Sequence, residues 1–308
     1  MSEANLRLAA QCGVDGVAAR YPGPRLEDLL VIKRRIESHD LALAAIEGYL
    51  PIEKLKLGED HDGVELAAMK RLVKNMGEAG VSLLCYNFMA GTDWVRTTLD
   101  APERGGAKVT GFDLQEAERA VSLNHGGSVD GAKGITAEQL WAHLEGFLRE
   151  LVPVAEEAGV TLAMHPDDPP LPVFNGKARI MNTVEGFERL VSLVPSERNA
   201  VCFCQGTFAT MGVDVPATIR RLGPHIRYVH FRDVKGTADS FVETFHDNGP
   251  TNMVDAVRAL REVGFNGPIR PDHVPQLEGE DDGEPGYTML GRLFAFGYIR
   301  ALIQATEE

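Results

Sequence analysis

The chain alternates short apolar runs with longer amphipathic stretches, and this alternation limits its fold more than any other feature. Strand-like runs cover residues 14–20, 41–48, 81–88, 160–166, 199–205, 226–233 and 267–273. Helix-like segments cover residues 26–39, 62–79, 136–158, 183–193, 215–222, 251–263 and 287–305. Such alternation requires a parallel sheet, and right-handed crossovers wind the sheet towards a barrel. We therefore predict an α/β fold with a single (β/α) barrel domain of the TIM type over residues 1–308.

Residues 100–135 interrupt this rhythm after the third strand-like run. They contain APERGGAKVTGF, a short helical DLQEAERAVSLN and then HGGSVDGAKG. A connection this long is usually functional or mobile. We expect a loop that forms a lid over the rim of the barrel; a disordered surface excursion is the alternative.

The charge and the N-terminus limit the partners of the chain. Lys and Arg total 31 against 45 Asp and Glu, a net charge of −14, and no basic cluster is long enough to neutralise a phosphate backbone. The first residues, MSEANLRLAAQCG, lack the apolar core of a signal peptide, and no segment is long and apolar enough to span a bilayer. We expect a cytoplasmic protein that binds neither nucleic acid nor membranes.

Four side chains that bind metals well stand at the ends of four successive strand-like runs: His165, Cys204, His230 and Asp272. Singly, each is more often structural, because a strand-end His or a strand Cys commonly serves packing or hydrogen bonding. Together they would meet at one rim, since parallel strands end on the same side of a barrel. Two imidazoles, a thiolate and a carboxylate suit Zn, Fe, Mn or Co, whereas the sulfur disfavours Mg and Ca.

The ligand pattern favours a catalytic site with open coordination positions over a closed structural zinc site. Structural zinc ligands usually come in CxxC-type pairs, which this sequence lacks. Cys202 and Cys204 are two residues apart on one strand and share a face, which suits ligation or packing better than a mutual disulfide. A reducing compartment fits the cysteines.

Further polar residues fall near the same rim: Asn87, Arg96, Asp167, Asp168, His273 and Tyr287. We expect the first four of them to bind substrate. Arg96 could hold a substrate carboxylate with two parallel hydrogen bonds. Asp167 and Asp168 follow His165 directly, where a carboxylate could orient a ligating imidazole or contact substrate. Each of these three residues could equally be a solvated loop residue.

The motifs that carry these residues resemble those of the mannonate dehydratases, metal-dependent barrel enzymes of hexuronate breakdown that are related to xylose-isomerase-like barrels. The similar segments, in order, are CYNFM, DWVRT, PVAEEAGVTLAMHPDDPP, CFCQGTF, VHFRDV, GPIRPDH and GYTMLGRLFAFGYIRAL. The resemblance covers about residues 14–305. It implies Mn²⁺ or Fe²⁺ bound by the four residues at the strand ends, and an acid/base pair formed by His273 and Tyr287.

The resemblance implies dehydration of a sugar acid, D-mannonate to 2-keto-3-deoxy-D-gluconate or a close analogue. The alternatives are a metal-dependent sugar isomerase or epimerase on the same barrel, and a non-catalytic sugar-acid binding homologue. The family usually has one more strand before the first run found here, so we expect a seven-stranded or incompletely closed barrel. The N-terminal residues, the last helix or another subunit should cover its gap, and we expect a homo-oligomer, a dimer or larger.

Overall fold

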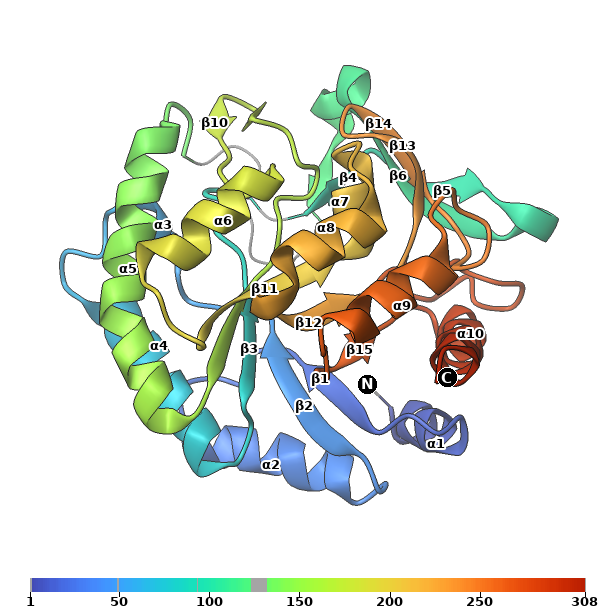
Figure 1. Cartoon of the computed structure of the whole chain (residues 1–308), viewed down its shortest axis with the longest axis horizontal. Helices are drawn as coiled ribbons and strands as arrows, with labels where there is room; N and C mark the ends of the chain where they lie inside the picture. Colours follow the sequence, from blue (N-terminus) through green and yellow to red (C-terminus); the bar gives the residue numbers. More distant parts are fainter. Residues whose placement is uncertain (1, 49, 93, 123–131, 308) are drawn as a thin grey trace.

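A curved sheet of parallel strands forms the centre of the computed structural model, which describes residues 2–48, 50–92, 94–122 and 132–307 (Figure 1). Within these residues, the sheet order is β1-β2-β3-β8-β11-β12-β15, and every neighbouring pair is parallel. The strands are β1 (Gly16–Ala19), β2 (Ala42–Glu47), β3 (Leu83–Tyr86), β8 (Thr161–Met164), β11 (Asn199–Cys204), β12 (Ile226–His230) and β15 (Ile269–Arg270). Each lies within one of the predicted runs, so the seven-stranded parallel prediction is confirmed.

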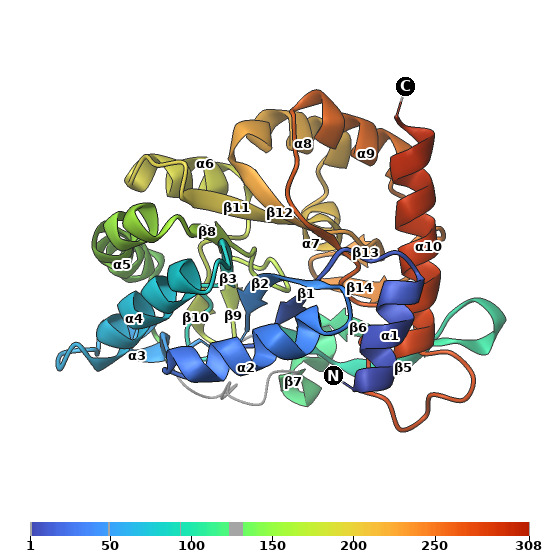
Figure 2. The same cartoon turned by 90° about the horizontal axis from the view of Figure 1, so that it is seen from below.

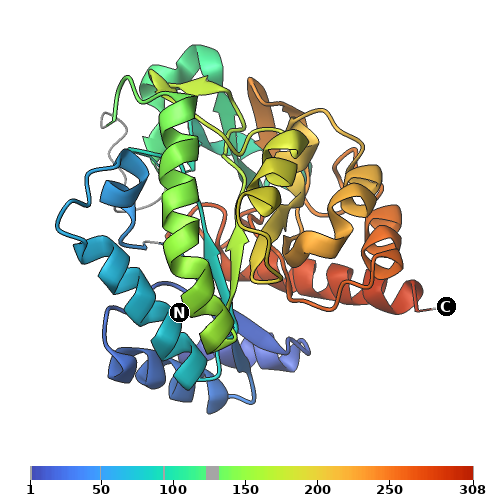
Figure 3. The ribbon, with the colours of Figure 1, turned by 60° about the vertical axis from the view of Figure 1, so that its left-hand side comes forward.

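Helices cover the outer face of this sheet, as Figures 1 and 3 show. The longer ones are α1 (Glu3–Gln11), α2 (Leu26–Glu37), α4 (Val64–Glu78), α5 (Ala137–Ala158), α6 (Val184–Leu193), α8 (Val215–Leu222), α9 (Met253–Glu262) and α10 (Met289–Ala305). Two short helices are α3 (Glu53–Leu57) and α7 (Gln205–Thr210). Local signals set the ends of α5: Thr136 and Gln139 form a reciprocal capping box, and Gly159 ends the helix with φ 70°. The sequence did not predict α1, α3 or α7.

The sheet is a half-closed barrel, because β1 and β15 stand at its two edges and do not pair with each other within the described residues. Helices α1 and α10 pack against one another beside this opening (Figure 2). Of the three alternatives predicted to cover the gap, the N-terminal residues and the last helix lie beside it, and a role for another subunit stays a prediction.

The excursion after β3 is more regular than predicted. It contains β4 (Val95–Arg96), β5 (Thr98–Pro102), β6 (Lys108–Asp113) and β7 (Val121–Ser122), with 3₁₀ turns at Arg104–Gly106 and Leu114–Arg119. β5 and β6 join β14 (Ser240–Glu243) and β13 (Val234–Thr237), which follow β12, in a second, antiparallel sheet. A small hairpin, β9 (Val173–Phe174) with β10 (Lys177–Ala178), and the turn Gly223–His225 complete the described elements. Residues 123–131 lie outside the described residues, and the lid role stays a prediction.

Alternation along β11 separates the core from the site. Val201 and Phe203 belong to the large apolar core between sheet and helices, whereas Cys202 faces the inside of the barrel. Cys204 lies two residues further on, so it shares that inner face at the rim. Within the described residues, no helix has the length and apolarity needed to cross a membrane.

Candidate metal centre and active site

The four residues predicted as ligands meet at the carboxyl ends of β8, β11, β12 and β15. One donor atom each of His165, Cys204, His230 and Asp272 lies within 4.8 Å of the others. Sheet register brings them together: Cys204 pairs with His230, and His230 with Arg270, two residues before Asp272. Cys204, His230 and Asp272 are buried, while His165 is half-buried.

Hydrogen bonds orient both imidazoles of this four-residue cluster. His165 Nδ1 lies 2.7 Å from the carbonyl oxygen of Pro166, which can only accept, so Nδ1 carries a proton and Nε2 is the nitrogen that can offer a lone pair to a metal. His230 Nε2 lies 3.3 Å from a carboxylate oxygen of Glu47, while His230 Nδ1 is buried with no hydrogen-bond partner in the described part of the chain. A buried, unsatisfied nitrogen that faces other donors is what an absent cation leaves behind. The residues present therefore fit a divalent metal.

The charges in the cluster also match a cation. Burial alone would raise the pKa of the Cys204 thiol, but Arg232 and His165 outweigh it and hold this pKa well below its usual value. Burial lowers the pKa of both imidazoles, but the Cys204 thiolate and, for His230, the Asp272 carboxylate raise these values to about 9. Without a metal, two imidazole protons therefore balance the thiolate and the carboxylate.

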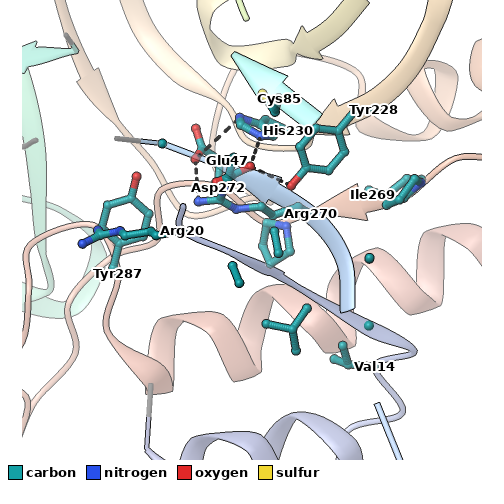
Figure 4. A pocket seen from close by; sticks show the side chains of 18 of the residues that line it. Val14, Arg20, Glu47, Cys85, Tyr228, His230, Ile269, Arg270, Asp272 and Tyr287 are labelled. Atoms are coloured by element: carbon teal, nitrogen blue, oxygen red, sulfur yellow. Dashed lines mark hydrogen bonds and ion pairs between the residues drawn. The ribbon is translucent and has the colours of Figure 1, made fainter. Parts of the chain in front are cut away.

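Glu47, at the end of β2, forms an outer layer behind the cluster that the sequence analysis missed. Its Oε2 accepts hydrogen bonds from Tyr228 Oη at 2.9 Å and His230 Nε2 at 3.3 Å, and its other oxygen pairs with Arg270. Figure 4 shows Glu47 between His230, Tyr228 and Arg270. Carboxylates in this position fix the ring of a ligating histidine and raise its basicity. The carboxylate at the end of the strand-like run LALAAIEG is the signal that could have found it.

His273 and Tyr287 lie together beside the cluster. Their rings meet edge to face with centroids 5.4 Å apart, and Trp94 stacks on His273 at 4.3 Å. His273 Nδ1 lies 2.8 Å from Glu243 Oε1, which leaves Nε2 free when Nδ1 carries the proton. The sequence predicted that Tyr287 begins the last helix. In the structure, Tyr287 lies two residues before α10, which begins at Met289. The arrangement holds two proton-transfer groups next to a candidate metal position.

Comparisons with known proteins show the family of this chain. A family model for D-mannonate dehydratase (UxuA) matches residues 3–308. A mannonate dehydratase of Oceanobacillus iheyensis is 34% identical over 296 residues, which cover 90% of this chain and 84% of the relative. Mannonate dehydratase 2 of Halalkalibacterium halodurans is 33% identical, with 92% of this chain and 88% of the relative covered. The chain belongs to the D-mannonate dehydratase family.

Solved structures place this family member among known barrels. The crystal structure of mannonate dehydratase from Streptococcus suis serotype 2 matches with a TM-score of 0.87 at 31% identity, covering 98% of this chain and 89% of that one. An L-ribulose 3-epimerase and a xylose isomerase-like TIM barrel protein from Mycobacterium smegmatis each match with a TM-score of 0.62, at 15% and 16% identity. The last two similarities show the fold alone. The predicted family and barrel class are confirmed.

Arg96 and Asp168, expected to bind substrate, form a buried ion network in this dehydratase-family chain. Arg96 donates to both oxygens of Asp168 at 2.8 and 3.0 Å and to Glu243 Oε1 at 2.7 Å. Arg232 donates to Asp168, Glu243 and Asp272 at distances from 2.8 to 3.1 Å. The Arg96 guanidinium, which we predicted to bind a substrate carboxylate, is thus hydrogen-bonded to the carboxylates of Asp168 and Glu243. The network instead ties β4 and β14 to the metal cluster and to His273.

Asn87 and Asp167, the other two expected substrate contacts, differ in position. Asn87 Oδ1 accepts from Lys56 Nζ at 3.1 Å and lines the central cavity. Asp167 is buried, and its Oδ2 accepts from the backbone N–H of Met181 at 2.7 Å. The acceptor that orients His165 is the Pro166 carbonyl, so neither Asp167 nor its neighbour has the orienting role that the sequence suggested.

A cavity of about 1380 Å³ opens at the rim and extends to the gap between β1 and β15. It is lined at the rim by His165, Asp168, His230, Asp272, His273 and Tyr287. Arg292 also lines it, with its guanidinium 5.3 Å from the centre of the Tyr287 ring. In the described part of the chain, Arg292 forms no ion pair, and burial followed by the nearby Arg270 lowers its pKa to about 10. Figure 4 shows Tyr287, Arg270 and Asp272 around this space.

Proposed function

We propose that this protein is a metal-dependent dehydratase that converts D-mannonate into 2-keto-3-deoxy-D-gluconate. The observation that carries the proposal is the convergence of the four-residue cluster with His273 and Tyr287 at one rim. Family membership and the activity for which its relatives are named support it. Mn²⁺ and Fe²⁺ are the ions we propose, since two imidazoles, one thiolate and one carboxylate suit such transition ions.

The proposed ligand atoms follow from the hydrogen bonds. His165 Nε2 and His230 Nδ1 are the nitrogens left free, and Cys204 Sγ and an Asp272 oxygen complete the set. A bound divalent ion supplies Lewis-acid stabilisation of the negative charge that develops on the substrate carboxylate when the neighbouring proton leaves. The pKa values of Cys204 and Asp272 are held well below their usual ranges, which favours their anionic, metal-binding forms.

We assign the proton acceptor to His273 and the proton donor to Tyr287. His273 donates its Nδ1 proton to Glu243, so Nε2 can take the proton from the carbon next to the substrate carboxylate. Burial, followed by the Asp272 carboxylate, raises the pKa of Tyr287, so its phenol keeps its proton at neutral pH. Tyr287 can then protonate the departing hydroxyl, which leaves as water and gives an enol. The enol loses its hydroxyl proton and gains one at the neighbouring carbon to become the 2-keto-3-deoxy acid, and the proton held by His273 restores the Tyr287 phenol.

The groups proposed to hold the sugar acid are those that line the cavity without serving as ligands. Asn87 and Asp168 remain candidates because both line it, and Arg292 joins them as a cation. Direct substrate contact by Arg96 and Asp167 stays a prediction. We also propose a homo-oligomer, supported by the open edges of β1 and β15, which sedimentation analysis can test. A cytoplasmic location stays a prediction.

Product analysis tests the proposed reaction. Metal-free protein is loaded separately with Mn²⁺ or Fe²⁺ and incubated with D-mannonate, and the products are identified by NMR. A 2-keto-3-deoxy acid is expected. A ketose or an epimeric aldonic acid would favour the isomerase or epimerase alternative, and thermal stabilisation by D-mannonate without any product would favour a binding protein.

A further inference from the structure

Two more thiols face the inside of the barrel, one layer below the metal cluster. Cys85 lies on β3 and Cys202 on β11, and both are buried. Cys202 precedes Cys204 by two residues on the same strand, so it points the same way one step deeper. One donor atom each of Cys85, Cys202 and His230 lies within 4.8 Å of the others. Figure 4 shows Cys85 next to His230.

Small side chains surround part of this inner layer, and the central cavity reaches it at Cys85. Barrel interiors are usually filled by bulky branched side chains. Here the inner cluster around Cys85 and Cys202 includes three alanines, Ala45, Ala163 and the partly buried Ala18, beside the larger Leu83 and Tyr228. The central cavity reaches Cys85, so an ion can approach from the rim.

A disulfide does not explain the pair. Strand β8 lies between β3 and β11 in the sheet, so the two backbones are roughly two strand spacings apart, about 9–10 Å. A disulfide rarely bridges Cα atoms more than about 7 Å apart. Two thiolates around one tetrahedral zinc-like ion have sulfur atoms about 3.8 Å apart, since each Zn–S bond is about 2.3 Å. The donor atoms of Cys85, Cys202 and His230 lie within 4.8 Å of one another, which suits an ion between them.

We propose that Cys85, Cys202 and His230 form a second metal site, for a thiophilic d¹⁰ cation such as Zn²⁺, Cd²⁺ or Cu⁺. Two thiolates and one imidazole without a carboxylate favour soft ions over Mn²⁺. His230 belongs to both clusters, so an ion in the deeper site takes a ligand away from the four-residue cluster. This competition rests on the proposed function, whereas binding at the deeper site does not.

Cadmium X-ray absorption tests the site directly by counting the sulfur neighbours of the ion. Metal-free protein receives one equivalent of Cd²⁺. Two sulfur neighbours are expected in the wild type and in Cys204→Ser, and one or none in Cys85→Ala and Cys202→Ala. Cys12→Ser, at the end of α1, is the matched control and should behave as the wild type. One sulfur per Cd²⁺ in the wild type, lost only in Cys204→Ser, would overturn the proposal.

The sulfur counts of the wild type and of Cys204→Ser together decide the matter even if Cys85→Ala or Cys202→Ala fails to fold, which circular dichroism reveals. The competition is tested by adding Cd²⁺ to Mn²⁺-loaded protein and following free Mn²⁺ by electron paramagnetic resonance. Cys85→Ala and Cys202→Ala should need at least about tenfold more Cd²⁺ to release Mn²⁺, which is a change of about 1.4 kcal/mol. Unchanged release in both variants would refute the shared-ligand competition, and dehydratase activity is not needed for either readout.

Discussion

Glu243 is the position where the buried ion network can be tested most sharply. Its Oε1 accepts from His273 Nδ1 at 2.8 Å, from Arg96 Nη2 at 2.7 Å and from Arg232 Nη1 at 3.1 Å. Its Oε2 accepts from Arg232 Nη1 at 2.9 Å. In Glu243→Gln, the amide oxygen can replace Oε1, but the NH₂ group then faces the Arg232 guanidinium, a second donor.

The expected cost follows from this geometry. One hydrogen bond between charged groups is lost, worth about 1.5–3 kcal/mol. Removing one partner of a buried ion pair costs about 3–5 kcal/mol when the remaining charge is left uncompensated. Asp168 still pairs with both Arg96 and Arg232, so the charges remain partly compensated. We therefore expect Glu243→Gln to lower the free energy of unfolding by about 2–3 kcal/mol.

Urea denaturation followed by circular dichroism measures this change, on protein stripped of metal so that binding does not contribute. Glu262→Gln is the matched control, because Glu262 also pairs with an arginine, Arg220, but its side chain is 54% exposed against 2% for Glu243. The control should lose less than about 1 kcal/mol. Equal losses of unfolding free energy in Glu243→Gln and Glu262→Gln would refute the reasoning. Burial would then not make the ion pairs of Glu243 stronger than the exposed pair of Glu262.

Three further outcomes follow from the site. His273→Ala and Tyr287→Phe should each lower turnover at least about 100-fold with metal content unchanged by elemental analysis; near-normal turnover would remove that residue from the mechanism. The pKa values of His165 and His230 are raised to about 9 without metal, so bound ions displace imidazole protons below that pH. The Kd for Mn²⁺ should thus fall about 10- to 100-fold from about pH 7 to pH 8 in titration calorimetry, and a flat profile would contradict this. Glu47→Gln should weaken Mn²⁺ binding about 10- to 100-fold. Unchanged affinity would show that Glu47 does not support metal binding through His230.

The central sheet and the metal cluster were predictable because their signals are local. The four strand-like runs that carry the ligands each end in polar residues, and parallel strands must end on one side, so Cys204 and His230 at their strand ends had to meet. Asp272 lies two residues beyond β15, yet the register with β12 still brings it to the same rim.

The rest of the site depends on pairing between distant segments, which no local pattern reveals. β6 pairs with β14 across more than a hundred residues, and only this pairing brings Glu243 close to Arg96. The sequence could therefore place Arg96 near the rim but not foresee that its guanidinium is held by protein carboxylates. A short helix such as α7 (Gln205–Thr210) is missed because one or two turns carry too little periodicity.

Anomalous X-ray scattering from crystals of the Mn²⁺-loaded protein tests the central claim most directly. The account predicts one strong manganese peak within bonding distance of His165, Cys204, His230 and Asp272. A Mn²⁺-dependent dehydratase whose crystals show no peak there, with manganese bound elsewhere, would contradict it.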